Sequence, residues 1–405
     1  MTTYAEPGHT WRSLHVRNFR LWFVGQVISV AGTWTQTVAQ AVLVLRLSNN
    51  NGIAAGASVA SQYLPTLLFG VWGGLLADRR DKRKLLMITQ VILAALAGLL
   101  AVLDLTGVIS LWMVYTVVAV SGCATAIDQP TRQSFVTELV GEEDLPNAIG
   151  LNSTIFNAAR MVGPAVAAGV IFVSGTGGCF LINALSYVAI FMALIRMRAD
   201  ELYRSSPLPK ARGQVRAGIA YAWSKPLLRA NLLLMTMVGT FAFNFTVVIP
   251  LVAKVTFHGG SGTVSTVFIF QGGGALAGSL LIASIRRTDG HRLAIATLVL
   301  SASMFVAALA PSLGWLLVIS PVMGVAQIFT ASSSNALVQL DTDASMRGRV
   351  TSLRTLTVIG STPIGGLVAG TVSEIANPRW ALALGGVGCL VGLALGRGLI
   401  VDKRP

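Results

Sequence analysis

Long apolar runs alternate with short polar connections along the whole of this 405-residue chain. A helix needs about 20 apolar residues to cross the hydrocarbon core of a bilayer, and the chain holds twelve runs of that kind. They lie at roughly 19–45, 53–77, 85–105, 109–138, 146–172, 178–197, 229–253, 263–285, 292–311, 314–338, 350–373 and 380–400. The pattern predicts an all-α polytopic membrane protein with twelve transmembrane helices and both termini on one side.

The longest connection divides these helices into two sets of six. It is rich in Arg and Pro, and four of its residues recur at helical spacing: Val215, Ile219, Ala222 and Trp223. This spacing indicates an amphipathic helix on the inner membrane surface. We therefore expect an N-terminal half at 1–197, a linker at 198–228 and a C-terminal half at 229–405.

The two predicted halves resemble each other weakly. Gly163 and Pro164 in the fifth helix are echoed by Thr362 and Pro363 in the eleventh. A duplicated six-helix unit is common among transporters, whose substrate sites lie where the two repeats meet.

Four of the predicted helices carry polar residues at three- and four-residue steps, which place each row on one helix face. The rows are Gln26, Ser29, Thr33, Gln36 and Gln40 in the first helix, Ser121, Thr125, Asp128 and Arg132 in the fourth, Thr236, Thr240 and Asn244 in the seventh, and Gln327, Thr330 and Ser334 in the tenth. One interpretation is that every third helix lines a shared substrate cavity. The alternative is that the hydroxyls bond back to their own helix and the amides join neighbouring helices.

Charged side chains inside the predicted helices are rare, and Asp128 and Arg160 are two of them. Such residues mark functional sites in membrane proteins. Asp128 and Arg160 lie at similar depths on consecutive helices, so Asp128 is a candidate proton carrier beside Arg160. Two alternatives remain open: a permanent ion pair between them, or a pair of Asp128 with Arg132 one turn away.

Composition supports a membrane protein and argues against nucleic-acid binding. Only 11% of the residues are charged and 54% are hydrophobic, whereas about a quarter are charged in typical soluble proteins. The net charge is +14, yet nearly all the cations fall in or beside connections on one side. Five Lys or Arg lie between Gly73 and Lys84 alone. Positive loops stay in the cytoplasm and attract anionic lipids, so we expect cytoplasmic termini.

Several motifs resemble the major facilitator superfamily. One is the set Gly74, Ala77, Asp78, Arg79, Lys82 and Arg83 after the second helix, and another is Gly163-Pro164 in the fifth. Two runs, Asp128-Gln129-Pro130-Thr131-Arg132-Gln133 and Asn157-Ala158-Ala159-Arg160-Met161-Val162-Gly163-Pro164, are similar to a branch with enterobactin exporters and multidrug efflux proteins. The resemblance implies the twelve-helix major facilitator fold and export of small molecules.

The resemblance also assigns roles to individual residues. It implies a cytoplasmic gate made by Gly74, Asp78, Arg79, Lys82, Arg83 and Arg132. In the outward-facing state Asp78 would bond the start of the eleventh helix and Arg132, and a carboxylate does favour a helix N-terminus. The implied helix-packing residues are Gly163, Pro164 and Pro363.

The chain departs from the family pattern at two places. Asp81 replaces the usual glycine of the gate motif, so we expect a weaker turn and an added negative charge. Ala167 and Ala168 replace the paired glycines that usually follow Gly163-Pro164, which makes close packing and proton antiport less secure there.

Three functional hypotheses follow. The first is a secondary transporter that exports a small amphipathic compound, such as a drug, siderophore or metabolite, by alternating access in exchange for protons. The second is a proton-independent uniporter or importer, and the third is an intramembrane enzyme or receptor. The sequence has no HExxH motif and no Gly-Lys phosphate-binding motif, so we expect no metal, no cofactor and no enzyme activity. The expected form is a monomer in the plasma (inner) membrane, whose partners are its small-molecule substrate and membrane lipids.

Overall fold

The computed structural model describes residues 11–203, 214–283, 289–343, 346–397 and 399. These residues form helices joined by short connections, and no strand occurs among them. The first half contains η1 (Arg12–His15), α1 (Arg17–Leu47), α2 (Gly52–Arg79), α3 (Lys82–Leu105), α4 (Leu111–Leu139), α5 (Leu145–Arg196) and η2 (Ala199–Glu201). The second contains α6 (Gln214–Ser224), α7 (Pro226–Met237), η3 (Val238–Ala242), α8 (Phe245–Leu251), η4 (Val252–Thr256), α9 (Ser261–Ala283), α10 (Gly290–Ala308), α11 (Leu313–Asp341), α12 (Arg347–Ile359), α13 (Thr362–Ile375) and α14 (Pro378–Leu395).

These helices agree with twelve crossings of a membrane. Within the described residues, ten helical runs are long and apolar enough to span a bilayer, and α2 adds another across a bend of 58°. The 52-residue α5 is two helices joined at Gly175, whose φ of 71° is easily reached only by glycine. It therefore supplies both the fifth and the sixth span. The all-α membrane fold predicted from the sequence is confirmed.

Two further spans are less regular than the apolar pattern predicts. The eleventh is broken into α12 and α13 at Gly360 and Ser361, because Pro363 has no N–H group and restricts the residue before it. The seventh contains two π-helical turns, η3 and η4. Such turns often occur at functional sites.

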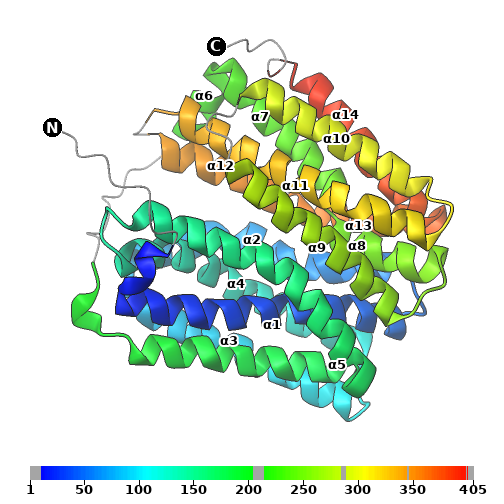
Figure 1. The fold of residues 1–405 in the computed structure, drawn as a ribbon, viewed down its shortest axis with the longest axis horizontal. Coiled ribbons are helices and arrows are strands. Elements are labelled where there is room, and N and C mark those ends of the chain that lie inside the picture. Colours follow the sequence, from blue (N-terminus) through cyan, green and yellow to red (C-terminus); the bar gives the residue numbers. More distant parts are fainter. Residues whose placement is uncertain (1–10, 204–213, 284–288, 344–345, 398, 400–405) are drawn as a thin grey trace.

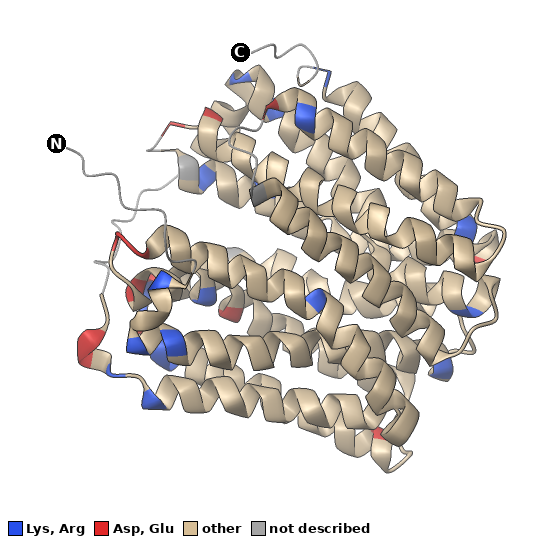
Figure 2. Cartoon of the chain, viewed as in Figure 1, with Lys and Arg blue, Asp and Glu red and all other residues tan. Residues whose placement is uncertain are grey.

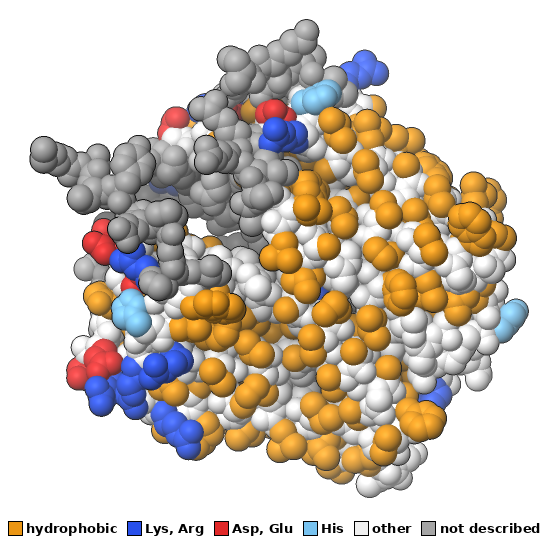
Figure 3. All heavy atoms as spheres, viewed as in Figure 1, with side chains coloured by type: hydrophobic (Ala, Val, Ile, Leu, Met, Phe, Trp, Pro, Cys, Tyr) orange, Lys and Arg blue, Asp and Glu red, His pale blue; other side chains and the backbone are white. Residues whose placement is uncertain are grey.

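Figure 1 shows α1 to α5 packed in one layer and the later helices in another. The two halves make their most extensive contacts through α2 against α13 and α5 against α9. Most charged residues lie at the end of the bundle that holds the α2–α3 connection, as Figure 2 shows. This end is called the charged end below, and the other is called the opposite end. Hydrophobic side chains cover the face between them (Figure 3).

A helix is present in the predicted amphipathic segment of the linker. In α6 the side chain of Ala222 is buried against Leu228 and Val350 of the C-terminal half, whereas Ile219 and Trp223 are exposed. Linker residues 204–213 lie outside the described residues.

The end of this linker is held to the end of α11 by polar contacts. The Lys225 ammonium lies 3.3 Å from an Asp343 carboxylate oxygen, and the Asp343 backbone N–H donates to the Tyr221 hydroxyl at 2.9 Å. Hydrogen bonding from Tyr221, and then the cationic Lys225, hold the pKa of the Asp343 carboxyl below its usual value. These contacts fix the linker helix to the C-terminal half.

Candidate functional site

A cavity of about 420 Å³ lies between the two halves near the charged end. Its walls come from α2 and α4 on one side and α12 on the other. Ligand pockets of about 300–1,000 Å³ hold small organic molecules. The polar side chains on these walls include Asp78, Gln129, Gln133, Arg349, Thr351 and Thr355. The cavity can therefore admit an organic compound between the halves.

The polar stripes predicted from the sequence contain no residue of this wall. Gln129 and Gln133, like Thr351 and Thr355, stand four residues apart and so share a helix face. This spacing could have identified the two pairs from the sequence. Both pairs lie near the charged end of the bundle. None of the thirteen predicted substrate-cavity residues lines this cavity.

At the opposite end the two halves are in close contact. Gly52 and Gly56 of α2 pack directly on the backbone of Gly366 and Gly370 of α13, with no room for a side chain. The Glu374 carboxylate accepts a hydrogen bond of 2.6 Å from the Gly52 backbone N–H. A carboxylate from the C-terminal half thus stabilises the N-terminus of a helix in the other half. This contact is called the α2–α13 seal.

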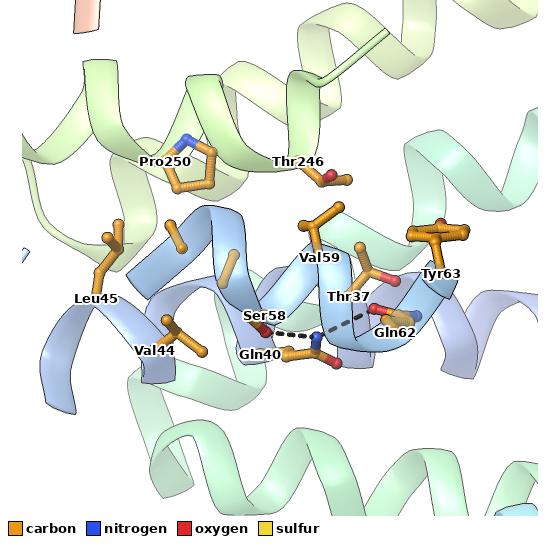
Figure 4. A pocket seen from close by; sticks show the side chains of 12 residues that line it. Thr37, Gln40, Val44, Leu45, Ser58, Val59, Gln62, Tyr63, Thr246 and Pro250 are labelled. Atoms are coloured by element: carbon orange, nitrogen blue, oxygen red, sulfur yellow. Dashed lines mark hydrogen bonds between the residues drawn. The ribbon is translucent and has the colours of Figure 1, made fainter. Parts of the chain in front are cut away.

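A second, much smaller cavity lies behind the seal (Figure 4). The Gln40 side-chain amide donates to the Ser58 hydroxyl at 3.2 Å and to the Gln62 amide oxygen at 3.1 Å. Thr246 and Pro250 of α8 cover this group from the other half. The volume of about 30 Å³ is sufficient for water but not for an organic substrate.

Asp128 is at the centre of a buried polar cluster. Its carboxylate accepts hydrogen bonds from the Thr89 hydroxyl at 2.7 Å and the Gln90 amide at 2.6 Å, and it forms an ion pair with Arg132. Arg132 also donates to the side-chain oxygens of Gln26 and Gln90, at 2.6 and 2.9 Å. The cluster joins α1, α3 and α4 within one half. Of the pairings left open by the sequence, the structure has Asp128 with Arg132.

Arg160 does not join this cluster. Its guanidinium donates to the Gln327 side-chain oxygen at 2.8 Å and lies over the Trp34 ring, 5.2 Å from the ring centre. It forms no ion pair with any residue that the structure describes. Arg160 therefore connects α5 of the N-terminal half with α11 of the C-terminal half.

Most hydroxyls in the predicted polar stripes bond back to their own helix. Ser121, Thr125, Thr236 and Thr240 each donate to the carbonyl oxygen four residues earlier, as does the Asn244 amide. This is the arrangement of the second interpretation, in which the stripe satisfies local backbone groups.

The remaining stripe residues have varied surroundings. Thr33 bonds the Ser29 carbonyl, Gln36 accepts from Asn183 at 2.6 Å, and the Ser334 hydroxyl accepts from Arg354. A few buried stripe atoms make no hydrogen bond within the described residues: Gln26 Nε2, Ser29 Oγ, Asn244 Oδ1 and Thr330 Oγ1. Unpaired buried polar atoms are uncommon and point to water or to a second conformation.

The predicted gate residues divide into two groups in this conformation. Asp78 is exposed in the large cavity and makes no hydrogen bond or ion pair with the described residues, although Gly348 and Arg349 of α12 line the same cavity. Gly74 also lines it, and Arg79 is exposed beside Asp78. Arg132 is engaged by Asp128 instead of Asp78.

The other two gate cations have partners within their own half. Lys82 forms a buried ion pair with Glu138 at the end of α4. Arg83 donates to the backbone carbonyl oxygens of Leu194 and Ile195, at 2.7 and 3.0 Å. Both contacts tie the α2–α3 connection to its neighbours.

Asp81 stabilises the turn that it was expected to weaken. Its side chain accepts a hydrogen bond of 3.0 Å from the Lys84 backbone N–H and so caps the N-terminus of α3. Its φ of −58° makes glycine unnecessary there. Such a cap stabilises a helix by about 1 kcal/mol.

The predicted helix-packing residues lie at contacts between helices. Gly163 is packed against Trp34, and the Thr35 hydroxyl donates to the Gly163 carbonyl at 3.1 Å. Pro164 and Pro363 are buried. Ala167, one of the two departures from the family pattern, is fully buried, so a methyl group is accommodated at that position.

Replacing Asp78 by Asn is expected to slow transport several-fold without changing which compounds bind. Asp78 makes no bond to the described residues in the present conformation, so the substitution should affect only the state in which it meets α12. Transport rates and equilibrium binding measured on the same preparations test this. A large loss of substrate affinity in the Asn variant would contradict a gating role for Asp78.

A family model described as a transmembrane secretion effector matches residues 8–403. Macrolide efflux protein A of Streptococcus pyogenes is 25% identical over 389 residues, which make up 94% of each chain. The multidrug efflux pump Tap of Mycolicibacterium fortuitum is 24% identical over 359 residues, 86% of this chain and 87% of Tap. The staphyloferrin A transporter of Staphylococcus aureus is 28% identical over 179 residues, 43% of this chain and 44% of that protein.

Solved structures share the fold. A bacterial homologue of the human lysosomal transporter Spinster, inward-facing and occupied, aligns with a TM-score of 0.73 and 14% identity over 97% of each chain. A POT family transporter in complex with a thioalcohol-conjugated peptide gives 0.76 and 11% identity, over 93% of this chain and 95% of that one. At these identities the likeness concerns the fold alone.

Proposed function

This chain belongs to the transmembrane secretion effectors of the major facilitator superfamily, and from that premise we propose that it is a secondary active exporter of a small amphipathic organic compound. The observation that carries the proposal is the difference between the two ends of the bundle. A cavity of about 420 Å³ separates the halves at the charged end, while the α2–α13 seal closes the opposite end. In alternating access the charged end would close and the α2–α13 seal at the opposite end would open.

The charge distribution supports a direction for transport. The α2–α3 connection carries five Lys or Arg, so it is expected to face the cytoplasm. The cavity then opens inward, and a compound enters it from the cytoplasm before export. Relatives named for macrolide, multidrug and staphyloferrin A transport support a drug, siderophore or metabolite as substrate. We propose a monomer in the plasma membrane that needs no cofactor.

Proton exchange is the proposed driving force, and Asp128 is the proposed carrier. It is a buried carboxylate held by three donors, one of them the cationic Arg132. Protonation would remove the ion pair and release Arg132, which is also the predicted partner of Asp78 at the gate. The proton on Asp128 would thereby be linked to closure of the charged end.

Inverted membrane vesicles that contain the full chain test the proposal. A proton gradient with the interior acidic should drive accumulation of compounds from a panel of amphipathic dyes and drugs, because inverted vesicles turn export into uptake. Collapse of the gradient should abolish accumulation. Movement that does not depend on the proton gradient would instead support the proton-independent uniporter or importer. Vesicles without the chain serve as the control.

A further inference from the structure

We propose that Arg160 binds a negatively charged group of the transported compound, most simply a carboxylate, so that this chain selects organic anions with an apolar body. The inference rests on the proposed transport function and names its substrate class. Four observations on the described residues carry it: the missing counter-ion, the unused hydrogen-bond donors, the position between the two halves, and the aromatic ring beside the cation.

The first observation is that Arg160 has no anionic partner among the described residues. Charges within membrane spans are costly and usually paired. Two other largely buried cations have such partners, since Arg132 pairs with Asp128 and Lys82 with Glu138. Arg160 forms no ion pair in the described part of the chain. A ligand carboxylate would supply the missing charge.

The second observation concerns the hydrogen-bond donors of the guanidinium. Arginine has five N–H donors in a planar fork that matches a carboxylate with two parallel bonds. Within the described residues the Arg160 side chain makes a single hydrogen bond, from Nη2 to Gln327. The Nε and Nη1 groups are therefore available to a ligand. Neutral Gln327 positions the fork without neutralising it.

The third observation is position. Arg160 lies where the two halves meet, because Gly272 of α9 packs on its backbone and Gln327 of α11 accepts its hydrogen bond. An anion bound here would therefore lie between the N-terminal and C-terminal halves, whose interface contains the substrate site in transporters built from two repeats.

The fourth observation is the Trp34 ring, whose face lies 5.2 Å from the Arg160 guanidinium carbon. A cation over an aromatic ring remains attractive to an anion on its free side. The ring also offers apolar surface for the body of an amphipathic ligand. Charge and ring together fit an aromatic or aliphatic carboxylate better than a cation.

Arg354 provides a matched control. Like Arg160, it is a partly buried arginine without an ion pair to the described residues, but its guanidinium donates to α11 of its own half. It donates to the Ser334 hydroxyl at 2.9 Å, the Asn335 side-chain oxygen at 3.4 Å and the Ala331 carbonyl at 2.6 Å. Removing Arg354 therefore deletes a partly buried cation without deleting the proposed anion site.

The experiment measures binding of two fluorescent probes that share an apolar body. Pyrenebutyrate carries a carboxylate, and pyrenebutyl-trimethylammonium carries a cation. The full chain in nanodiscs, with empty nanodiscs as blanks, is titrated by fluorescence anisotropy. Wild type should bind the carboxylate more tightly. Arg160→Gln should weaken carboxylate binding by about ten- to a hundredfold, the size expected for lost charged hydrogen bonds, and should leave the cation unaffected.

Further variants separate charge from folding. Arg160→Lys should give an intermediate affinity because it keeps the charge but loses the planar fork. Arg354→Gln should bind both probes as wild type does. Thermal unfolding of each variant is measured in parallel, and Arg160→Lys remains informative if Arg160→Gln does not fold.

Three outcomes would overturn the proposal: equal carboxylate binding by wild type and Arg160→Gln, a wild-type preference for the cation, or no binding of the carboxylate. Because no gradient is used, this result is independent of the test of export. Failure of proton-driven accumulation in vesicles with carboxylate binding intact would reject the export mechanism and leave the anion site.

Discussion

Asp128→Asn is expected to lower proton-driven transport by about tenfold or more while substrate binding persists, because Asn keeps the shape of Asp but carries no titratable proton. In the structure Asp128 accepts from Thr89 and Gln90 and is paired with Arg132. Asn can accept at one atom only and would leave Arg132 without its anion. Gradient-driven uptake into inverted vesicles and probe binding at equilibrium are the two measurements.

Glu138→Gln is the matched control for Asp128→Asn. Glu138 lies on the same helix, α4, and its side chain is almost as buried in an ion pair with Lys82. Its replacement should lower the stability of the protein in a similar way, because either change removes the anion of a largely buried ion pair. Transport by the Glu138→Gln variant should still depend on the proton gradient. Equal coupling in the two variants would show that Asp128 acts only as a structural residue.

The fold could be predicted because the bilayer imposes a simple rule. Every backbone polar group in hydrocarbon must be satisfied within the protein, so each long apolar run becomes a helix. The rule misses local irregularity, because apolar content does not reveal where a helix bends. The break before Pro363 depends on a missing backbone donor, and the turn at Gly175 on a positive φ. Both residues were visible in the sequence, but their effects are local.

The site could be predicted less well because side-chain partners depend on packing between distant segments. The sequence left the partner of Asp128 open, because the rotation of the helices decides whether Arg132 or Arg160 meets it. Gln327 lies 167 residues from Arg160 in the chain, and nothing in the polar stripe of the tenth span specified that contact. The residues that line the cavity also depend on the conformation of the protein, and the sequence does not specify one conformation.

Substitution in the α2–α13 seal at the opposite end should reduce transport as strongly as substitution of Asp128. Gly56→Leu is expected to abolish transport because any side chain at this position meets the backbone of α13, with the added Cβ 3.0 Å from the Gly366 carbonyl carbon and 3.1 Å from the Leu367 Cα. Backbone atoms cannot move aside as a flexible side chain can. The α2–α13 seal would stay open, and the chain could not return to the conformation described here.

Labelling at Ser58 distinguishes an open seal from a misfolded chain. Ser58 is buried behind the seal, so a Ser58→Cys variant should resist a membrane-impermeant maleimide until Gly56→Leu is added. Gly169→Leu is the control, since nothing lies within 4 Å of a Cβ at that position. It should neither expose the thiol at position 58 nor reduce transport. Normal transport by Gly56→Leu would mean that closing α2 on α13 is not required, and alternating access about this contact would have to be abandoned.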